Sequence, residues 1–317
     1  MYNQISVGAE VLRRGGLVAF PTETVYGLGA DANNDHAVRK IFKAKGRPTN
    51  HPLIVHISSG TQLSIWARDI PDYAKNLAEK FWPGPLTLIL KNSGFASNYV
   101  TGGHESIGVR VPSNPFALEL LDKFEQIGGF GIAAPSANRF GAVSSTSATA
   151  VKKEIGKYLD ENDFILEGGE CEIGIESTII NCLNNAPSII RPGFIAEKIL
   201  SNELGLDFVS KSVNNQIRAS GEFQSHYSPR ARVTLNENAV TGDGFIAFSN
   251  IKTPNGAIRL ASPDTIEQFA RSLYKALSEG DEKSLSRIVV ITPEGEGLAE
   301  AIRDRLFKAS NLNQTEI

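Results

Sequence analysis

Hydrophobic residues in this sequence form short apolar runs separated by amphipathic stretches. The runs that predict strands are residues 17–20, 52–57, 86–90, 107–112, 132–138, 164–169, 174–181 and 189–193. The stretches that predict helices are residues 5–14, 35–45, 61–68, 72–81, 114–124, 148–159 and 195–204, and Asp35 is expected as the N-cap of the second. This alternation favours an α/β fold in which helices pack on a sheet.

A doubly basic turn closes the predicted helix at residues 35–45. Gly46 suits the left-handed backbone position after a helix, and Pro48 prevents the helix from continuing. The turn therefore fixes the side chains of Lys45 and Arg47, whereas the other basic residues of the helix lie off its apolar stripe. A guanidinium beside an ammonium suits a phosphate or carboxylate, so this turn is either an anion site or an ordinary helix end.

Polar and basic side chains recur at the ends of the predicted strands, where α/β proteins assemble ligand sites. The positions, within strands or at their ends, are residues 22–26, Arg110, residues 136–138, Ser177, Thr178 and Arg191, and His56 is embedded in the predicted strand at residues 52–57. Structural alternatives exist: His56 can be a satisfied core residue, Arg110 can reach solvent, and residues 136–138 can form a simple turn. The basic turn, Arg110 and Arg191 together suit a substrate with several anionic groups.

Composition narrows the class of protein. A length of 317 residues allows two units with sizeable cores, and 41% hydrophobic with 21% charged residues is typical of a soluble chain. The formal net charge of −3 argues against electrostatically driven nucleic-acid binding. Cys171 and Cys182 are too few for a disulfide framework, which favours the reducing cytoplasm. Residues 1–16 lack a long apolar run, so we expect no signal peptide and no membrane span.

A second unit follows a polar connection. Residues 207–229 have weak periodicity and many Ser, Asn and Gln, which predicts a linker, although His226 and Tyr227 are unusual in a spacer. Strands predicted at residues 244–248, 257–260 and 288–291 alternate with helices at residues 265–277 and 297–309. This spacing predicts a small α/β domain with a mostly parallel sheet. The predicted boundaries are residues 1–206, 207–230 and 231–317.

Several common catalytic motifs do not occur in the sequence. It contains no GxxxxGK[ST] loop, no GxGxxG fingerprint, and neither GxSxG nor HExxH. A P-loop NTPase and a dinucleotide-binding enzyme are therefore not supported. The residues alone indicate an α/β pocket for a polyanionic ligand.

Six segments, taken in order, resemble the threonylcarbamoyl-AMP synthase family, also called YrdC-like. They are residues 21–28 (PTETVYGL), 45–48 (KGRP), 52–56 (PLIVH), 82–87 (WPGPLT), 134–138 (APSAN) and 176–179 (ESTI). The resemblance covers residues 6–204, while residues 226–229 and 297–302 resemble the linker and C-terminal domain of the longer form. It implies a YrdC-like twisted mixed β-sheet domain around a basic concave pocket, and a smaller Rossmann-like α/β C-terminal domain.

The resemblance implies a reaction. L-threonine and bicarbonate condense to a carbamate, which attacks the α-phosphate of ATP to give threonylcarbamoyl-AMP and pyrophosphate. Such a nucleotidyltransferase must hold two anions in line and neutralise the departing pyrophosphate. Mg²⁺ is expected with ATP, and no aspartate cluster marks a dedicated protein metal site. A downstream transferase then moves the threonylcarbamoyl group onto tRNA.

The family resemblance, together with the polar residues described above, assigns candidate residues to catalysis, to ATP and to threonine. Catalytic candidates are Lys45, Arg47, Ser136 and Asn138. ATP candidates are Arg47, Asn50, His51, Asn138, Ser144, Arg191 and Tyr227. Threonine candidates are Thr24, His56, Arg110, Ser136 and Ser177, with Arg110 for the carboxylate and Ser177 for the carbamate end.

Tyr227 has two interpretations. By resemblance, the linker folds over the pocket and this ring excludes water from the labile adenylate. Alternatively, it only packs the linker onto the first unit. Arg230 stands where the family commonly has an uncharged or amide residue, which leaves contacts beyond Tyr227 open.

Two other functions use similar domains. An RNA-binding or ribosome-maturation role is disfavoured by the net acidity and by the lack of interleaved basic and aromatic runs. A carbamoyl-transfer role in hydrogenase maturation involves acylphosphatase-like and zinc-finger modules, for which this sequence lacks the cysteines. We therefore expect no stable nucleic-acid binding and no membrane association.

Overall fold

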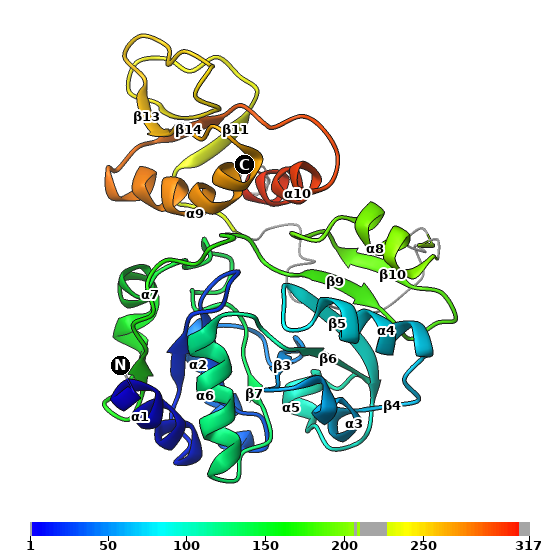
Figure 1. The fold of residues 1–317 in the computed structure, drawn as a ribbon. Helices are drawn as coiled ribbons and strands as arrows, with labels where there is room; N and C mark the ends of the chain where they lie inside the picture. The colour runs from blue at the N-terminus through cyan, green and yellow to red at the C-terminus, as the bar shows by residue number, and fades with distance from the viewer. Residues whose placement is uncertain (1, 206–207, 210–226, 311–317) are drawn as a thin grey trace.

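The computed structural model describes residues 2–205, 208–209 and 227–310, which form a larger and a smaller unit (Figure 1). Most of the predicted linker, including His226, lies outside the described residues. The helices of the smaller unit face the larger unit, with the smaller sheet beyond them. None of the described helices has the length and hydrophobicity needed to cross a bilayer.

Ten described strands of the larger unit form one mixed sheet. Their order is β10 (Ser188–Arg191), β9 (Thr178–Asn181), β5 (Leu86–Asn92), β6 (Ser106–Arg110), β3 (Ile54–His56), β7 (Ile132–Ala133), β2 (Gly27–Asp31), β1 (Val18–Phe20) and β8 (Phe164–Ile165), with β4 (Ala67–Arg68) paired to β5. The pairs β1 with β8, β3 with β6 and β5 with β9 run parallel, and the others run antiparallel. The predicted mixed α/β architecture is confirmed.

Helices pack on this sheet (Figure 1). Their buried apolar residues belong to the core clusters of the larger unit. They are α1 (Tyr2–Arg13), α2 (Asp35–Lys45), α3 (Leu63–Trp66), α4 (Asp72–Phe81), α5 (Asn98–Thr101), α6 (Pro115–Gln126), α7 (Ala148–Ile155) and α8 (Glu197–Leu204). In α2, the side chains of Val38, Ile41 and Phe42 are buried in the main core, as their helical spacing predicts.

The predicted N-cap of α2 is wrong by one residue. Asn34 is the cap, and its Oδ1 accepts hydrogen bonds from the amides of His36 and Ala37, both at 3.1 Å. Asp35 is instead the first helical residue, where its carboxylate meets the positive end of the helix dipole. Gly46 takes the left-handed conformation at φ 63° and ends the helix as predicted.

Sheet pairing overrides two other local predictions. The sequence predicts one helix at residues 61–68, but a 3₁₀ turn (Gly60–Gln62) and α3 lead directly into β4, because β4 pairs with β5. Strand β2 is not predicted, since its sequence GLGAD has low strand propensity. Its Gly29 permits close strand packing, because a Cβ there would lie 2.5 Å from Cγ2 of Ile132.

Two element boundaries also differ from the prediction. The helix predicted at residues 148–159 ends at Ile155 and continues as a 3₁₀ turn (Gly156–Tyr158), in keeping with the low helix propensity of glycine. The strand predicted at residues 174–181 begins only at Thr178. Gly174, with φ 84°, turns the preceding segment toward the C-terminal unit.

The C-terminal unit has one sheet of four described strands, all parallel. The strand order is β11 (Arg232–Leu235), β14 (Arg287–Val290), β12 (Gly244–Ile246) and β13 (Ile258–Ala261), with helices α9 (Ile266–Glu282) and α10 (Leu298–Ser310) on the side toward the larger unit. The predicted parallel α/β unit is confirmed, although β11 is not predicted. Val25, Val143 and Ile175 of the larger unit belong to the apolar cluster of this unit, so the two cores are continuous at the interface.

Candidate active site

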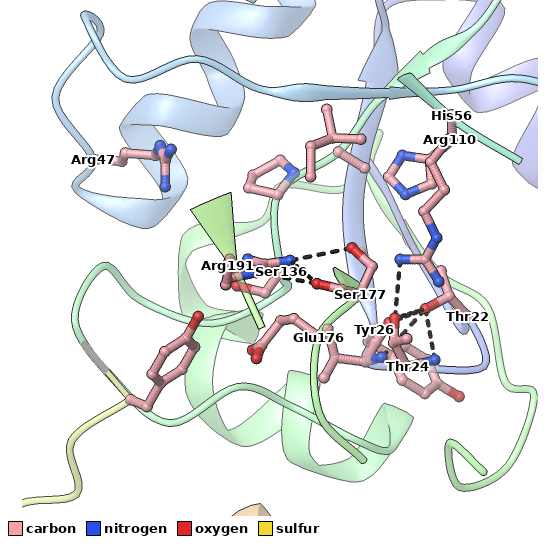
Figure 2. A pocket seen from close by; sticks show the side chains of 16 residues that line it. Thr22, Thr24, Tyr26, Arg47, His56, Arg110, Ser136, Glu176, Ser177 and Arg191 are labelled. Atoms are coloured by element: carbon pink, nitrogen blue, oxygen red, sulfur yellow. Dashed lines mark hydrogen bonds between the residues drawn. The ribbon is translucent and has the colours of Figure 1, made fainter. Parts of the chain in front are cut away.

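One cavity gathers side chains from separate strand ends of the larger unit (Figure 2). Its lining comprises Thr22, Thr24, Val25, Tyr26, Gly27, Arg47, Ile54, His56, Arg110, Ala134, Pro135, Ser136, Glu176, Ser177, Arg191 and Tyr227. The structure thus brings together the predicted candidates Thr24, Arg47, His56, Arg110, Ser136, Ser177, Arg191 and Tyr227. The cavity volume is about 50 Å³, which is room for a few water molecules.

His56 and Arg110 are neighbours at the ends of parallel strands β3 and β6. Arg110 does not reach solvent: its Nη2 donates to Oε1 of Glu23 at 2.5 Å, and its Nη1 donates to Oγ1 of Thr24 at 3.1 Å. Burial, together with the charge of Arg110, lowers the pKa of His56 to about 3. His56 is therefore neutral at physiological pH.

The turn between β1 and β2 presents hydroxyl groups to this arginine. Oγ1 of Thr22 donates to the carbonyl of Val25 at 2.6 Å and lies 2.8 Å from Oγ1 of Thr24. The amides of Thr24 and Val25 both donate to Oγ1 of Thr22 at 3.2 Å. The turn therefore holds its hydroxyls in fixed positions beside a guanidinium group.

Arg191 and Ser177 join the end of β10 to the entrance of β9. Nε and Nη2 of Arg191 donate to the carbonyl of Ser177 at 3.2 and 3.0 Å, and Nη2 also donates to its Oγ at 3.2 Å. The same Oγ lies 2.8 Å from Oγ1 of Thr87 on β5. In Figure 2, Arg47 and Arg191 lie on one side of the view, and His56 and Arg110 lie on the other. The cavity therefore has two cationic ends.

Lys45 lies behind the cavity lining. Its Nζ donates to the carbonyls of Ser136 at 2.6 Å and Asn138 at 2.5 Å, which ties the basic turn to the turn at residues 136–138. Burial, with the nearby charges of Arg47 and Arg139, lowers the pKa of Lys45 well below its usual value. Its observed contacts support the turn that carries Ser136.

Arg47 itself lines the cavity. Its Nη2 donates to the carbonyl of Pro52 at 3.1 Å, and burial lowers its pKa to about 10, so it stays cationic at neutral pH. Asn50 and His51, the neighbouring candidates for ATP binding, do not line the cavity. Asn50 is exposed, and the buried ring of His51 lies 5.4 Å from the ring of Phe140.

Asn138 and Ser144 also lie outside the lining and support it. The Nδ2 of Asn138 donates to two carbonyls of the following loop at 2.8 Å. The Oγ of Ser144 donates to Oε1 of Glu176 at 2.7 Å. The site prediction omitted Glu176, although a carboxylate directly before the hydroxyls of Ser177 and Thr178 was a usable signal.

Tyr227 reaches the cavity from the edge of the C-terminal unit. Its backbone is left-handed at φ 67°, a costly conformation for a residue other than glycine. The ring stacks on Tyr274 with centroids 5.7 Å apart, and the guanidinium carbon of Arg305 lies 5.4 Å from its centroid. Tyr227 therefore packs on the C-terminal unit and also closes one wall of the cavity.

The sequence of this chain matches two protein-family models and several known relatives. Residues 10–193 match the Sua5, YciO and YrdC family model, described as "Telomere recombination". Residues 195–311 match the model described as "Threonylcarbamoyl-AMP synthase, C-terminal domain". The threonylcarbamoyl-AMP synthase of Pyrococcus abyssi is 38% identical over 97% of this chain and 94% of that protein. This chain belongs to the threonylcarbamoyl-AMP synthase family.

Similarity to the threonylcarbamoyl-AMP synthase family spans both units. The Bacillus subtilis threonylcarbamoyl-AMP synthase is 36% identical over 97% of this chain and 93% of its own length. The crystal structure of P. abyssi Sua5 complexed with L-threonine has a TM-score of 0.86 at 37% identity, covering 96% of this chain and 94% of that one. The resemblance inferred from six short segments is confirmed.

Proposed function

We propose that this chain condenses L-threonine, bicarbonate and ATP into threonylcarbamoyl-AMP, pyrophosphate and water, acting as a nucleotidyltransferase. The supporting observation is one cavity lined by buried arginine side chains at its two ends, in a member of the threonylcarbamoyl-AMP synthase family. Two anionic reactants repel each other in water. A site with cations at both ends can hold them in reacting order.

Arg47 and Arg191 are proposed to bind the phosphates of ATP. Both line the cavity, and Arg47 stays cationic at neutral pH despite its burial. Their charges would stabilise the pyrophosphate as it leaves, in a site where few water molecules screen them. Lys45 and Asn138 would act with them by holding the turn that carries Ser136.

The other end of the cavity is proposed to bind threonine. Arg110 and Thr24 present a guanidinium and a hydroxyl held by hydrogen bonds, and neutral His56 adds a group that carries no competing charge. Glu23 already neutralises part of the Arg110 charge, so the threonine carboxylate would bind a guanidinium oriented in advance. Ser177, which accepts a hydrogen bond from Arg191, would meet the carbamate.

The chemistry proposed here needs no protein nucleophile. The carbamate oxygen forms the new bond to the α-phosphorus, and the bond from that phosphorus to the β,γ-pyrophosphate breaks. Burial raises the pKa of Cys171 to about 12, so its thiol stays protonated. Catalysis would come from positioning and charge stabilisation.

Mg²⁺ is proposed to enter with ATP. No group of three His, Cys, Asp or Glu side chains gathers into a metal site among the described residues. The carboxylate in the cavity lining, Glu176, accepts hydrogen bonds at both oxygens from Ser144, Tyr274 and Arg305. These residues do not fit a dedicated magnesium site, so we assign the ion to the phosphates.

Tyr227 is proposed to close the site over the adenylate. Its ring lines the cavity together with Arg47 and Arg191, the proposed phosphate ligands. Tyr227 joins the lining from outside the large sheet, and the proposed closure moves this ring over the bound adenylate. This closure would exclude water from the acyl adenylate.

The product is a labile mixed anhydride, so we propose that a transferase acting on tRNA consumes it. We also propose a cytoplasmic location. The two cysteines are free and buried, in keeping with that compartment.

The proposed activity is tested by mass spectrometry of a reaction containing the protein, ATP, threonine and labelled bicarbonate. A labelled adenylate that requires threonine is the expected product. Pyrophosphate release driven by carbamoyl phosphate, without threonine, would identify a carbamoyl-transfer protein. Salt-sensitive RNA binding without ATP consumption would favour a role on RNA.

A further inference from the structure

The C-terminal unit holds the segment that leads into the cavity at Glu176. A Cβ on Gly174 would lie 2.5 Å from Cα of Arg271, so this turn packs directly on helix α9. Ile175 is fully buried in the apolar cluster of the C-terminal unit. The backbone position of Glu176 is therefore set by the neighbouring unit.

The Glu176 carboxylate is held by groups from both units. Its Oε1 accepts from Ser144 at 2.7 Å, while its Oε2 accepts from the hydroxyl of Tyr274 at 2.9 Å and from Nε of Arg305 at 3.0 Å. The side chain of Arg305 has 0% exposure and that of Glu176 has 7%. A buried carboxylate needs such a partner, since an unpaired buried charge is strongly unfavourable.

Arg305 also reaches the strand that carries Arg191. Its Nη1 donates to the carbonyl of Pro192, directly after Arg191, at 2.9 Å. Arg191 in turn donates to Ser177, directly after Glu176. One guanidinium from helix α10 therefore holds the end of β10 and the entrance of β9 together.

The charged and titratable groups that face Glu176 come from several elements. They are Arg305 on α10, Tyr274 on α9, Arg191 on β10, and Tyr227. Asp304 acts indirectly, because it accepts a hydrogen bond from Arg305. Burial alone would raise the pKa of Glu176, but the charges of Arg305 and Arg191 hold it below its usual value. Glu176 is therefore an anion whose charge Arg305 neutralises.

We propose that Arg305 is a positioning residue for the nucleotide end of the cavity. Arg305 neutralises the charge of Glu176 and holds the carbonyl of Pro192 by a hydrogen bond. The guanidinium of Arg191 is thereby kept in position, with its charge available to the phosphates of ATP. The inference rests on the proposed ATP binding and gives the C-terminal unit a role in the site itself. Without Arg305, the anionic Glu176 would attract Arg191 and repel the phosphates of ATP.

The test is the dissociation constant of ATP between pH 6 and pH 8, measured by calorimetry with threonine present. Arg305→Met should weaken ATP binding on the order of 10- to 100-fold at pH 8, the loss expected when a charged hydrogen bond is removed. The loss should shrink toward pH 6, because removing the charge of Arg305 should raise the pKa of Glu176 and leave part of this carboxylate neutral at the lower pH. Adding Glu176→Gln should recover part of the affinity and remove this extra pH dependence.

Control variants separate positioning from simple destabilisation. Arg305→Lys keeps a cation and should retain most of the affinity. Arg303→Met, on the same helix, should bind ATP as the unaltered protein does, because within the described part of the chain the guanidinium of Arg303 donates to the carbonyls of Pro293 and Gly295, away from the cavity lining. If Arg305→Met does not fold, Tyr274→Phe keeps the ring and should show a smaller effect in the same direction.

Two results would overturn the inference. One is unchanged ATP binding in the folded Arg305→Met and Tyr274→Phe variants. The other is a loss that does not vary with pH and that Glu176→Gln does not relieve. The adenylate assay is run on the same samples: if the unaltered protein binds ATP but makes no adenylate, the proposed reaction fails while the binding comparison still decides the role of Arg305.

Discussion

The guanidinium of Arg110 and the carboxylate of Glu23 form a buried ion pair, with Nη2 and Oε1 2.5 Å apart and side-chain exposures of 5% and 4%. The pair keeps a cation in the cavity wall without leaving a buried charge unpaired. Removing only one partner should cost about 3–5 kcal/mol of stability, since the other charge stays buried.

Arg110 is therefore best removed together with the charge of Glu23. The double variant Arg110→Ala, Glu23→Gln should raise the KM for threonine about 10- to 100-fold, as for a lost hydrogen bond to a charged group. The KM for ATP should change far less. Steady-state kinetics with each substrate varied in turn checks this, with Arg68→Ala on the exposed surface as control. Equal changes in both KM values would contradict the threonine assignment.

Arg47 should affect the other substrate. Arg47→Ala should raise the KM for ATP by about 10- to 100-fold and leave the KM for threonine nearly unchanged, because a phosphate contact is lost. Arg39→Ala is the matched control: Arg39 lies on α2, the helix that ends just before Arg47, and is exposed. The assignment fails if the two variants behave alike.

His56 should make stability depend on pH. Burial and Arg110 lower its pKa from 6.5 to about 3, so below pH 6.5 the unfolded chain binds a proton that the folded protein does not. Stability should therefore fall with decreasing pH, by about 2 kcal/mol from this residue between pH 6.5 and pH 5. Urea unfolding should show a weaker pH dependence for His56→Gln. The same change at exposed His36 should leave the slope as it was.

Tyr227 should protect the adenylate. Tyr227→Ala removes the stacked ring, so water should reach the intermediate and adenylate should be lost faster per ATP consumed. Tyr227→Phe keeps the ring and should retain most of the protection. Mass spectrometry of adenylate against AMP over time measures the ratio. Identical ratios in all three proteins would show that the residue only packs the chain.

Local signals predicted much of the fold. Helix α2 and its glycine stop follow from apolar spacing and from the conformational freedom of Gly46, which operate over a few residues. Strand β2 was missed because its stability comes from pairing with β1 and β7 and from the close approach that Gly29 allows. The five residues of β2 give no information about either partner strand.

Some features of the candidate site were likewise predictable from local sequence, and others depend on the tertiary structure. The sequence pointed to Arg47, Arg110 and Arg191 because Arg47 follows a predicted helix and the two others lie within predicted strands near their ends, where side chains enter a shared cavity. Sequence could not distinguish Lys45 from Arg47 in the same turn. Only the tertiary structure shows that their roles differ: Lys45 donates to two backbone carbonyls behind the lining, whereas Arg47 lines the cavity.

The sequence by itself determined the α/β class, the two units and the family, because periodicity, turn residues and short motifs are carried by neighbours along the chain. Only the tertiary structure decided which charges compensate one another. Glu23 meets Arg110 across 87 residues, and Glu176 meets Arg305 across 129 residues. A buried charge must find its partner wherever the fold brings one, so no local pattern records these pairs.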